Sequence, residues 1–442
     1  MQNWKRKLIW AGVIIIVLLL IPWMIPMSAY TKQAESLAAR ALGVPVHIGS
    51  LQVAILPTPR LIASDLIVGR NEEFRVARLT VLPALTSMFS ETKAISSIRF
   101  ENPIIKKAAL DIIAALSKQP KDTSSKTTIN VHKIRISEAK ILWPDMQLPE
   151  INAVIDLNKE NMPKTASIES LDGKLKFDLT PEENRQIITF NAKAWTLPAG
   201  APLLIDKLDV NMVLSSNKLD ISNIHAALYG GKLSGHANLA WGKTYKLNGM
   251  MKLDNLAVHE PIKLMSKSSR VSGQLSSNGP FSASAKEVKQ LIDNLQANFQ
   301  FNVKNGVLYG FDLAKAPMML VGQGKGGETK FDAFSGDLDI SGKTYRFRNL
   351  NIESGLMAAN GEVKINPNKS LNGEVEVEVK KSVSIAAIPL EISGTLEDPK
   401  VFPTKAAIAG AVAGTAVLGP AGTGLGLKAG KAVDKLKGLF GN

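Results

Sequence analysis

Residues 374–379 read Glu-Val-Glu-Val-Glu-Val, and this stretch decides the class of fold. Successive side chains of a β-strand point to opposite faces of the sheet, so a strand here carries Val375, Val377 and Val379 on one face and glutamates on the other. One face of the predicted sheet is therefore apolar and the opposite face is polar and exposed to solvent. The alternation fits equally a sandwich, in which a second sheet covers the valines, and a trough whose apolar face stays partly open.

The same pattern recurs along the chain in short units, in each of which a glycine precedes an alternating strand. Repeated units of this kind bury a continuous face only when they stack on one another. We therefore predict a mainly β chain built on an elongated, curved antiparallel sheet with a few helices, near residues 284–295 and 312–321. The repeated units begin at Gly173, Gly231, Gly249, Gly273, Gly336, Gly361 and Gly373.

The N-terminal end contains a candidate transmembrane helix. Residues 8–29 carry no charged side chain, and at about 1.5 Å per residue they reach about 33 Å, enough to cross a hydrocarbon core of about 30 Å. Basic residues before the run and a tryptophan near each end predict a cytoplasmic stub of residues 1–7 and export of the remainder. A cleaved signal peptide, the alternative, has a shorter apolar region of about 7–15 residues. The predicted anchor and interface residues are Trp4, Lys5, Arg6, Lys7 and Trp23.

Composition predicts the organisation of the exported part. Residues 30–118 read as an N-terminal β/α region, residues 119–127 as a polar linker, and residues 128–403 as the main β-region. Residues 404–442 form a tail rich in Ala and Gly, whose basic amphipathic end is typical of a helix lying on an anionic membrane surface. The alternative is a disordered, Gly-rich tail. The residues predicted to contact a membrane here are Lys428, Lys431, Lys435, Lys437 and Phe440.

Several classes of chemistry find no support in the sequence. The 442 residues include no cysteine and only five histidines, which excludes thiolate metal sites and gives no histidine spacing typical of a metal site. There is no Gly-x-Ser-x-Gly motif, and the Gly-rich residues 322–329 lack the Gly-Lys-Ser/Thr of a phosphate loop. The net charge of +14 is spread along strands without the interleaved aromatics of a nucleic-acid surface. We expect no enzymatic activity, no cofactor, no metal and no nucleic-acid partner, and the oligomeric state stays open.

An opening segment and three ordered motifs further along the chain resemble a known family. Residues 43–51, followed by residues 57–61 and 65–66, look like the opening of the AsmA family of Gram-negative envelope proteins. Residues 228–235 (Leu-Tyr-Gly-Gly-Lys-Leu-Ser-Gly) resemble its "YGG" strand, residues 305–313 resemble its turn after a helix, and residues 388–399 resemble its closing strand. The Ala- and Gly-rich tail is not part of these motifs.

The resemblance implies an AsmA/TamB-like chain with a chorein-type repeating β-groove of taco shape. It also implies an inner-membrane anchor, a periplasmic bulk, membrane phospholipids as partners and a role in outer-membrane biogenesis and phospholipid transport. Val375, Val377 and Val379 then become candidate groove lining. A second hypothesis is an assembly or scaffold factor that recruits other envelope proteins through exposed strand edges.

Overall fold

The computed structural model describes most of the chain between residues 27 and 418. Among the described residues no helix is both long and apolar enough to cross a membrane; most of the predicted anchor (8–26) and the predicted linker (119–127) lie outside them. The described ranges are 27–84, 94–110, 112, 129–144, 146–183, 185–198, 201–265, 271–310, 312–313, 327–380 and 387–418.

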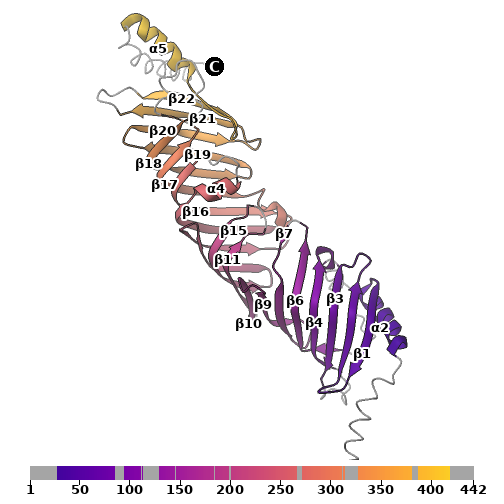
Figure 1. The fold of residues 1–442 in the computed structure, drawn as a ribbon. Helices are drawn as coiled ribbons and strands as arrows, with labels where there is room; N and C mark the ends of the chain where they lie inside the picture. The colour runs from indigo at the N-terminus through magenta and orange to yellow at the C-terminus, as the bar shows by residue number, and fades with distance from the viewer. Residues whose placement is uncertain are drawn as a thin grey trace, which may run out of the picture. The chain divides into compact units, whose positions relative to one another are not determined.

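The fold is mainly β (Figure 1). It divides into two compact units, with the division at residues 193–201. The first unit begins with helix α2 (Met27–Leu42). Its strands are β1 (Val46–Ala54), β2 (Arg60–Val68), β3 (Phe74–Pro83), β4 (Ala94–Lys106), β5 (Asn130–Val131), β6 (Lys133–Trp143), β7 (Met146–Gln147), β8 (Ile151–Leu157), β9 (Pro163–Ser170), β10 (Leu175–Glu182) and β11 (Arg185–Thr196).

The sheet of the first unit is mixed, whereas the sequence predicts a purely antiparallel one. β1 to β4 pair antiparallel in chain order, β6 then lies parallel to β4, and β8 to β11 continue antiparallel. A parallel pair needs a connection of about a dozen residues or more, and the chain between β4 and β6 is long enough to provide one. The segments on both sides of the predicted linker therefore belong to one sheet.

Helix α2 packs against the start of this sheet. Its Ala34 and Leu42 contact a hydrophobic cluster that includes Ile48 and Val76. The Glu35 carboxylate accepts a hydrogen bond from the backbone N–H of Ile48 at 2.7 Å. Because β1 pairs with β2 along its other edge, this carboxylate occupies a backbone donor that would otherwise be open to another strand.

The second unit is an up-and-down antiparallel sheet in which each strand pairs with its neighbour in sequence. This arrangement confirms the repeated turn-and-strand units. The strands are β12 (Leu204–Ser215), β13 (Lys218–Leu228), β14 (Gly231–Ala240), β15 (Tyr245–Ala257), β16 (Val271–Ala285), β17 (Gln296–Tyr309), β18 (Glu328–Ser341), β19 (Thr344–Glu353), β20 (Met357–Ile365), β21 (Leu371–Val379), β22 (Ile388–Gly394) and β23 (Pro399–Pro403).

The described helices of the second unit lie between or after its strands. They are α4 (His259–Met265), the 3-10 helix η2 (Val288–Gln290) and α5 (Lys405–Leu418). The helix predicted near 284–295 is present only as the 3-10 turn Val288–Gln290, because β16 continues to Ala285 and a single turn suffices to bury Leu291, while Ile292 is 80% exposed. The helix predicted near 312–321 lies almost entirely outside the described residues.

A recurring β-bulge curves the sheet of the second unit. In three strands an asparagine adopts a positive φ of 51–52° where the pairing register shifts, and the next residue is buried. Asparagine tolerates this conformation better than most residues, and a bulge adds one residue to its strand and increases the local twist. Each bulge therefore bends the sheet and returns the following side chains to the same face. The pairs are Asn255 and Leu256, Asn305 and Gly306, and Asn349 and Leu350.

Candidate functional site

The inner face of the second unit is the side of its sheet on which apolar residues of neighbouring strands stand opposite each other. Residues directly opposite in an antiparallel pair share a face. Leu233 of β14 faces Leu253 of β15, and Leu239 faces Leu247. The apolar pairing therefore crosses from strand to strand and forms a continuous surface. Further opposed pairs are Leu208 with Ala226, Val210 with Ile224, Met212 with Ile221, and Leu338 with Phe347.

Four phenylalanines form the middle of the inner face. The ring of Phe301 lies edge-on to Phe334, with centroids 5.4 Å apart, and to Phe347, at 5.9 Å. Phe331 adds a third such contact with Phe334, at 5.7 Å. These are favoured geometries for aromatic pairs. The floor between β17 and β19 is therefore a fixed aromatic surface.

Glycines opposite aromatic residues set the depth of this floor. Phe281 of β16 stands opposite Gly249 of β15, and a Cβ on Gly249 would lie 2.5 Å from the Phe281 ring. The ring covers the backbone that the glycine leaves bare, an arrangement known to stabilise glycine in sheets. Met251, two residues further on the same face, stands opposite Gly235 on one side and Gly279 on the other.

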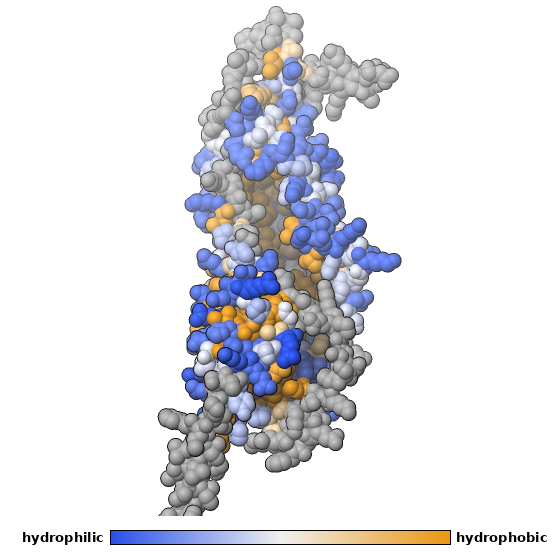
Figure 2. Space-filling view, turned by 90° about the vertical axis from the view of Figure 1, so that its right-hand side faces the viewer, coloured by the Kyte–Doolittle hydropathy of each residue, from blue (hydrophilic) through white to orange (hydrophobic). Residues whose placement is uncertain are grey.

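The inner face is accessible along part of its length. Figure 2 shows, in the upper part of the view, a hollow with a hydrophobic floor between two largely hydrophilic walls. Leu233, Leu247, Met251 and Leu253, in β14 and β15, are only half-buried. Large apolar side chains that stay partly exposed to water are energetically unfavourable unless another molecule covers them. The floor of β12 to β15 is therefore open to a molecule of suitable chemistry.

The three valines predicted to line the groove lie in a closed part of this face. Val375, Val377 and Val379 of β21 are 6%, 0% and 5% exposed. The Val-Glu alternation places them on the apolar face as expected, but Val375 and Val377 belong to a packed cluster with Leu390 of β22. The structure therefore shows these valines covered by protein, and their role as groove lining stays a prediction, because the alternation identifies a face and carries no information on what covers it.

The start of the C-terminal tail belongs to the same closed region. Ala407 and Ala411 of α5 are almost fully buried within the cluster that contains Val377 and Leu390. The helix begins where the Thr404 hydroxyl accepts a hydrogen bond from the N–H of Ala407 at 3.2 Å, as an N-cap does. One face of residues 404–411 therefore packs into the protein core, whereas the sequence placed these residues at the start of the Ala- and Gly-rich tail.

The outer face of the second unit is charged. Lys207 and Asp209, Lys218 and Asp220, and Lys252 and Asp254 form ion pairs two residues apart along their strands. On β18 and β19, Arg348 donates hydrogen bonds from Nε and Nη2 to both carboxylate oxygens of Asp339. This guanidinium lowers the pKa of Asp339.

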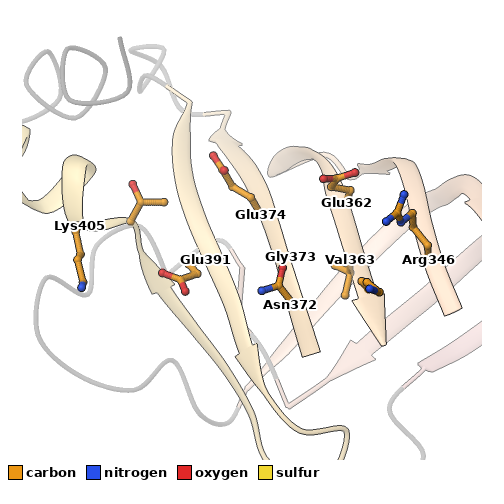
Figure 3. A pocket seen from close by; sticks show the side chains of 10 residues that line it. Arg346, Glu362, Val363, Asn372, Gly373, Glu374, Glu391 and Lys405 are labelled. Atoms are coloured by element: carbon orange, nitrogen blue, oxygen red, sulfur yellow. The ribbon is translucent and has the colours of Figure 1, made fainter. Parts of the chain in front are cut away.

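A polar pocket of about 610 Å³ lies on this outer face. Figure 3 shows Glu362, Glu374 and Glu391 on three neighbouring strands, between Arg346 at one end and Lys405 at the other. The glutamates stand directly opposite one another across β20, β21 and β22. With Lys364 the lining balances three carboxylates with three cations, and in the described part of the chain no three His, Cys, Asp or Glu residues are placed to hold a metal ion.

The other predicted site residues lie outside the described residues. This holds for the anchor set (Trp4, Lys5, Arg6, Lys7 and Trp23) and for the tail set (Lys428, Lys431, Lys435, Lys437 and Phe440). The residues that sequence reasoning missed are the half-buried leucines of β14 and β15, Met251 and the phenylalanine cluster. The signal for Leu233 and Met251 is the apolar residue two positions after the glycine in the repeated units, Gly231-Lys232-Leu233 and Gly249-Met250-Met251.

Comparison with known proteins supports the resemblance found in the sequence. Residues 174–347 match the model of the AsmA family, which confirms the resemblance over β10 to the first strand residues of β19. No curated protein and no solved structure matches the chain. The matched segment contains the open part of the inner face, and the match supports a role in the cell envelope.

Proposed function

We propose that the chain holds or conducts phospholipid between membranes, with acyl chains on the inner face of the second unit and head groups in water at its walls. Residues 8–29 anchor it in the inner membrane, and the bulk lies in the periplasm and serves outer-membrane biogenesis. The observation that carries this proposal is the hollow with a continuous, half-buried apolar floor (Figure 2).

The energetics of such a groove need no covalent chemistry. Each methylene that leaves water for an apolar surface gains about 0.8 kcal/mol. A phospholipid acyl chain therefore gains several kcal/mol on the floor, while its charged head group avoids desolvation by staying at the walls. Neighbouring strands present similar apolar residues, so a chain can move from one strand to the next without a large change in free energy. In this proposal the protein is not an enzyme.

We assign the acyl chains to β12–β15 and exclude them from the closed end formed by β20–β23. In β12–β15 the floor residues are half-buried, whereas in β21 and β22 Val377 and Leu390 are fully covered. A packed protein interior has no room for an additional chain. A lipid that travels the length of the unit then leaves the floor before β21, or displaces the residues that cover Val377.

The scaffold hypothesis is the second candidate, and two features of the sheet ends weigh against it. Glu35 occupies a backbone donor of β1, and the last strand, β23, carries Pro399 and Pro403. Prolines and blocked donors are devices that keep sheet edges from recruiting other strands. A protein that binds by adding a strand to the sheet edge would need a row of free backbone N–H groups there.

Adjacent methionines give the direct test of lipid binding. Met251 lies on the inner face between two glycines, whereas Met250 is 47% exposed on the outer face. A photoreactive amino acid at position 251 should crosslink to phospholipid when the full chain is irradiated in its native membrane. The same residue at position 250 should give little or no lipid adduct, as judged by mass spectrometry.

The methionine pair also separates the two hypotheses. Met251→Glu should abolish lipid copurification with the full chain and impair its function in cells, while Met250→Glu should leave both intact. Equal crosslinking at both positions, or full function of a folded Met251→Glu protein, would refute the groove. Crosslinks from 250 or from β23 to envelope proteins, without lipid at 251, would favour the scaffold.

A further inference from the structure

A second pocket lies in the first unit, apart from the inner face of the second. It has a volume of about 370 Å³, and its described lining comes from β3, β4, β6, β8 and the residue before β6. Pockets for small ligands usually measure about 300–1,000 Å³. This one therefore suits a small polar group rather than a long apolar chain.

Strand pairing places the charged residues of the pocket on one face of the sheet. β4 and β6 pair in parallel with Arg99 opposite Arg135. Ser97 precedes Arg99 by two residues and Lys133 precedes Arg135 by two residues, so all four side chains share a face. Asp156 of β8 stands opposite Lys133, on that same face. These five residues therefore line the pocket from one side of the sheet.

Arg99 and Arg135 are like charges placed side by side. Both are exposed, and among the described residues neither forms an ion pair or a side-chain hydrogen bond. Neighbouring strands lie about 4.8 Å apart, and like charges on directly opposed residues destabilise a sheet. An anion held between the two guanidinium groups would remove this repulsion. A phosphate group suits them because each guanidinium can donate two parallel hydrogen bonds to its oxygens.

Ser97 adds a buried hydroxyl to the pocket. The residue is 8% exposed and stands opposite Leu82 of β3. Its Oγ has no hydrogen-bond partner in the described part of the chain. A buried hydroxyl left without a partner is unfavourable, and such a group in a folded protein calls for an explanation. An oxygen of a ligand held by Arg99 could accept the hydrogen bond that this hydroxyl is free to donate.

The carboxylate in the lining is already paired. Asp156 Oδ1 lies 3.1 Å from Nζ of Lys133, and Oδ2 accepts a hydrogen bond from the Thr165 hydroxyl at 2.9 Å. The hydrogen bond from Lys133 lowers the pKa of Asp156. The carboxylate therefore holds Lys133 and leaves the two arginines to a ligand. Ser96 and His132, which also line the pocket, have the opposite parity along their strands and are not part of the site.

We propose that this pocket binds the phosphate group of a phosphate monoester. Arg99 and Arg135 bind the phosphate oxygens from two neighbouring strands, and the Ser97 hydroxyl donates a further hydrogen bond. The same group occurs on soluble phosphate esters and on phosphatidic acid. The site is independent of the proposed groove, because its described lining belongs to the first unit alone.

Isothermal titration calorimetry with glycerol 3-phosphate tests the site on the full chain in mild non-ionic detergent. Arg99→Gln/Arg135→Gln should weaken the affinity by at least about tenfold, as expected when two charge-assisted contacts are lost. Lys330→Gln/Lys343→Gln removes the same charge from exposed positions of the second unit. This control should change the affinity less than about twofold, because distant surface charges are screened by salt. No measurable binding to the wild type, or an equal loss in both double variants, would overturn the proposal.

The hydroxyl is tested by a separate variant. Ser97→Ala should weaken the affinity by about threefold or more because a hydrogen bond to the ligand is lost. It should not lower the urea midpoint of the unbound protein, since the hydroxyl has no partner to lose there. Ser96→Ala, the adjacent residue of opposite parity, is the matched control and should leave the affinity unchanged. Wild-type affinity in a folded Ser97→Ala protein would overturn the proposed site.

Competition identifies the source of the phosphate group. Displacement of glycerol 3-phosphate by phosphatidic acid added to the micelles would support the site with a lipid head group as its ligand. Displacement by inorganic phosphate but not by phosphatidic acid would support it with a soluble ester. Sodium acetate at the same concentration should not compete, and equal competition by acetate would overturn the assignment to phosphate. Met251→Glu should leave the affinity unchanged, so failure of this site and failure of the groove are read from different variants.

Discussion

Replacing Val377 by threonine tests whether the β21 end of the apolar face is closed. The two side chains have nearly the same shape, so the change adds a hydroxyl without a large cavity. Val377 is 0% exposed and packs in the main hydrophobic cluster. Val210 of β12 lies on the same face but is half-buried, and Val210→Thr is therefore the matched control.

The expected magnitudes differ severalfold. A hydroxyl buried without a partner costs about 1–3 kcal/mol in proteins, so we expect Val377→Thr to lower the free energy of unfolding by about 2 kcal/mol. A hydroxyl that reaches water at position 210 should cost about 0.5 kcal/mol or less. With a urea slope of about 3 kcal/mol per M for a unit of this size, the midpoint shifts are about 0.7 M and under about 0.2 M.

Urea denaturation followed by the fluorescence of Trp241 measures these shifts in the second unit. The other tryptophans are replaced by phenylalanine in all proteins compared, and the full chain is used. Equal small shifts for both variants would refute the closed end and return Val377 to the open part of the floor. Equal large shifts would mean that β12 is also covered, and the groove would lose its accessible floor.

Three further predictions concern the bulge, the outer face and the first strand. Asn349→Val should destabilise the second unit by about 1–2 kcal/mol because a β-branched residue is strained at a positive φ, whereas Asn349→Gly should cost much less in the same urea assay. The lowered pKa of Asp339 means that its pairing with Arg348 stabilises the fold above about pH 4, the ordinary Asp pKa, and that this contribution disappears as pH falls through the lowered value. The stability difference between wild type and Asp339→Asn should thus shrink between pH 5 and 2, and a constant difference would refute the assignment. Glu35→Ala should free the N–H of Ile48 and increase self-association in sedimentation velocity, with Ser36→Ala as the neutral control.

The alternation of apolar and polar residues was sufficient to predict the sheet and its apolar face. The valines of β21 stand opposite Met357, Ala359 and Gly361 of β20, so they share one face as period-two side chains require. What the alternation could not predict is the covering of that face. Val377 and Met251 occupy equivalent inner positions, but one is buried by residues distant in sequence and the other is not.

The errors have local physical causes. The apolar residues Val288, Leu291 and Ile292 have helical spacing, but only Leu291 finds a core to pack against, and the strand before it continues further than the pattern indicated. The parallel pair of β4 and β6 depends on the long connection between them, residues 107–132, whose sequence does not indicate which strand the chain pairs with next. In a sequence, an asparagine inside a strand pattern indicates a turn. In this structure the asparagine adopts a positive φ within the strand and forms a bulge.

The order of strands in the second unit has a consequence for how the chain acquires its structure during synthesis. Because each strand pairs with the one just before it, its contacts are close in sequence, and such topologies fold without waiting for distant segments. The sheet can grow one strand at a time from β12, with a single advancing edge exposed to aggregation at each moment. That vulnerable edge disappears only when the two prolines of β23 have been added. A chain released from the ribosome before residue 399 would therefore carry a nearly complete sheet whose edge strand is free to pair with other chains. Such shortened forms should depend more on chaperones than the full chain does.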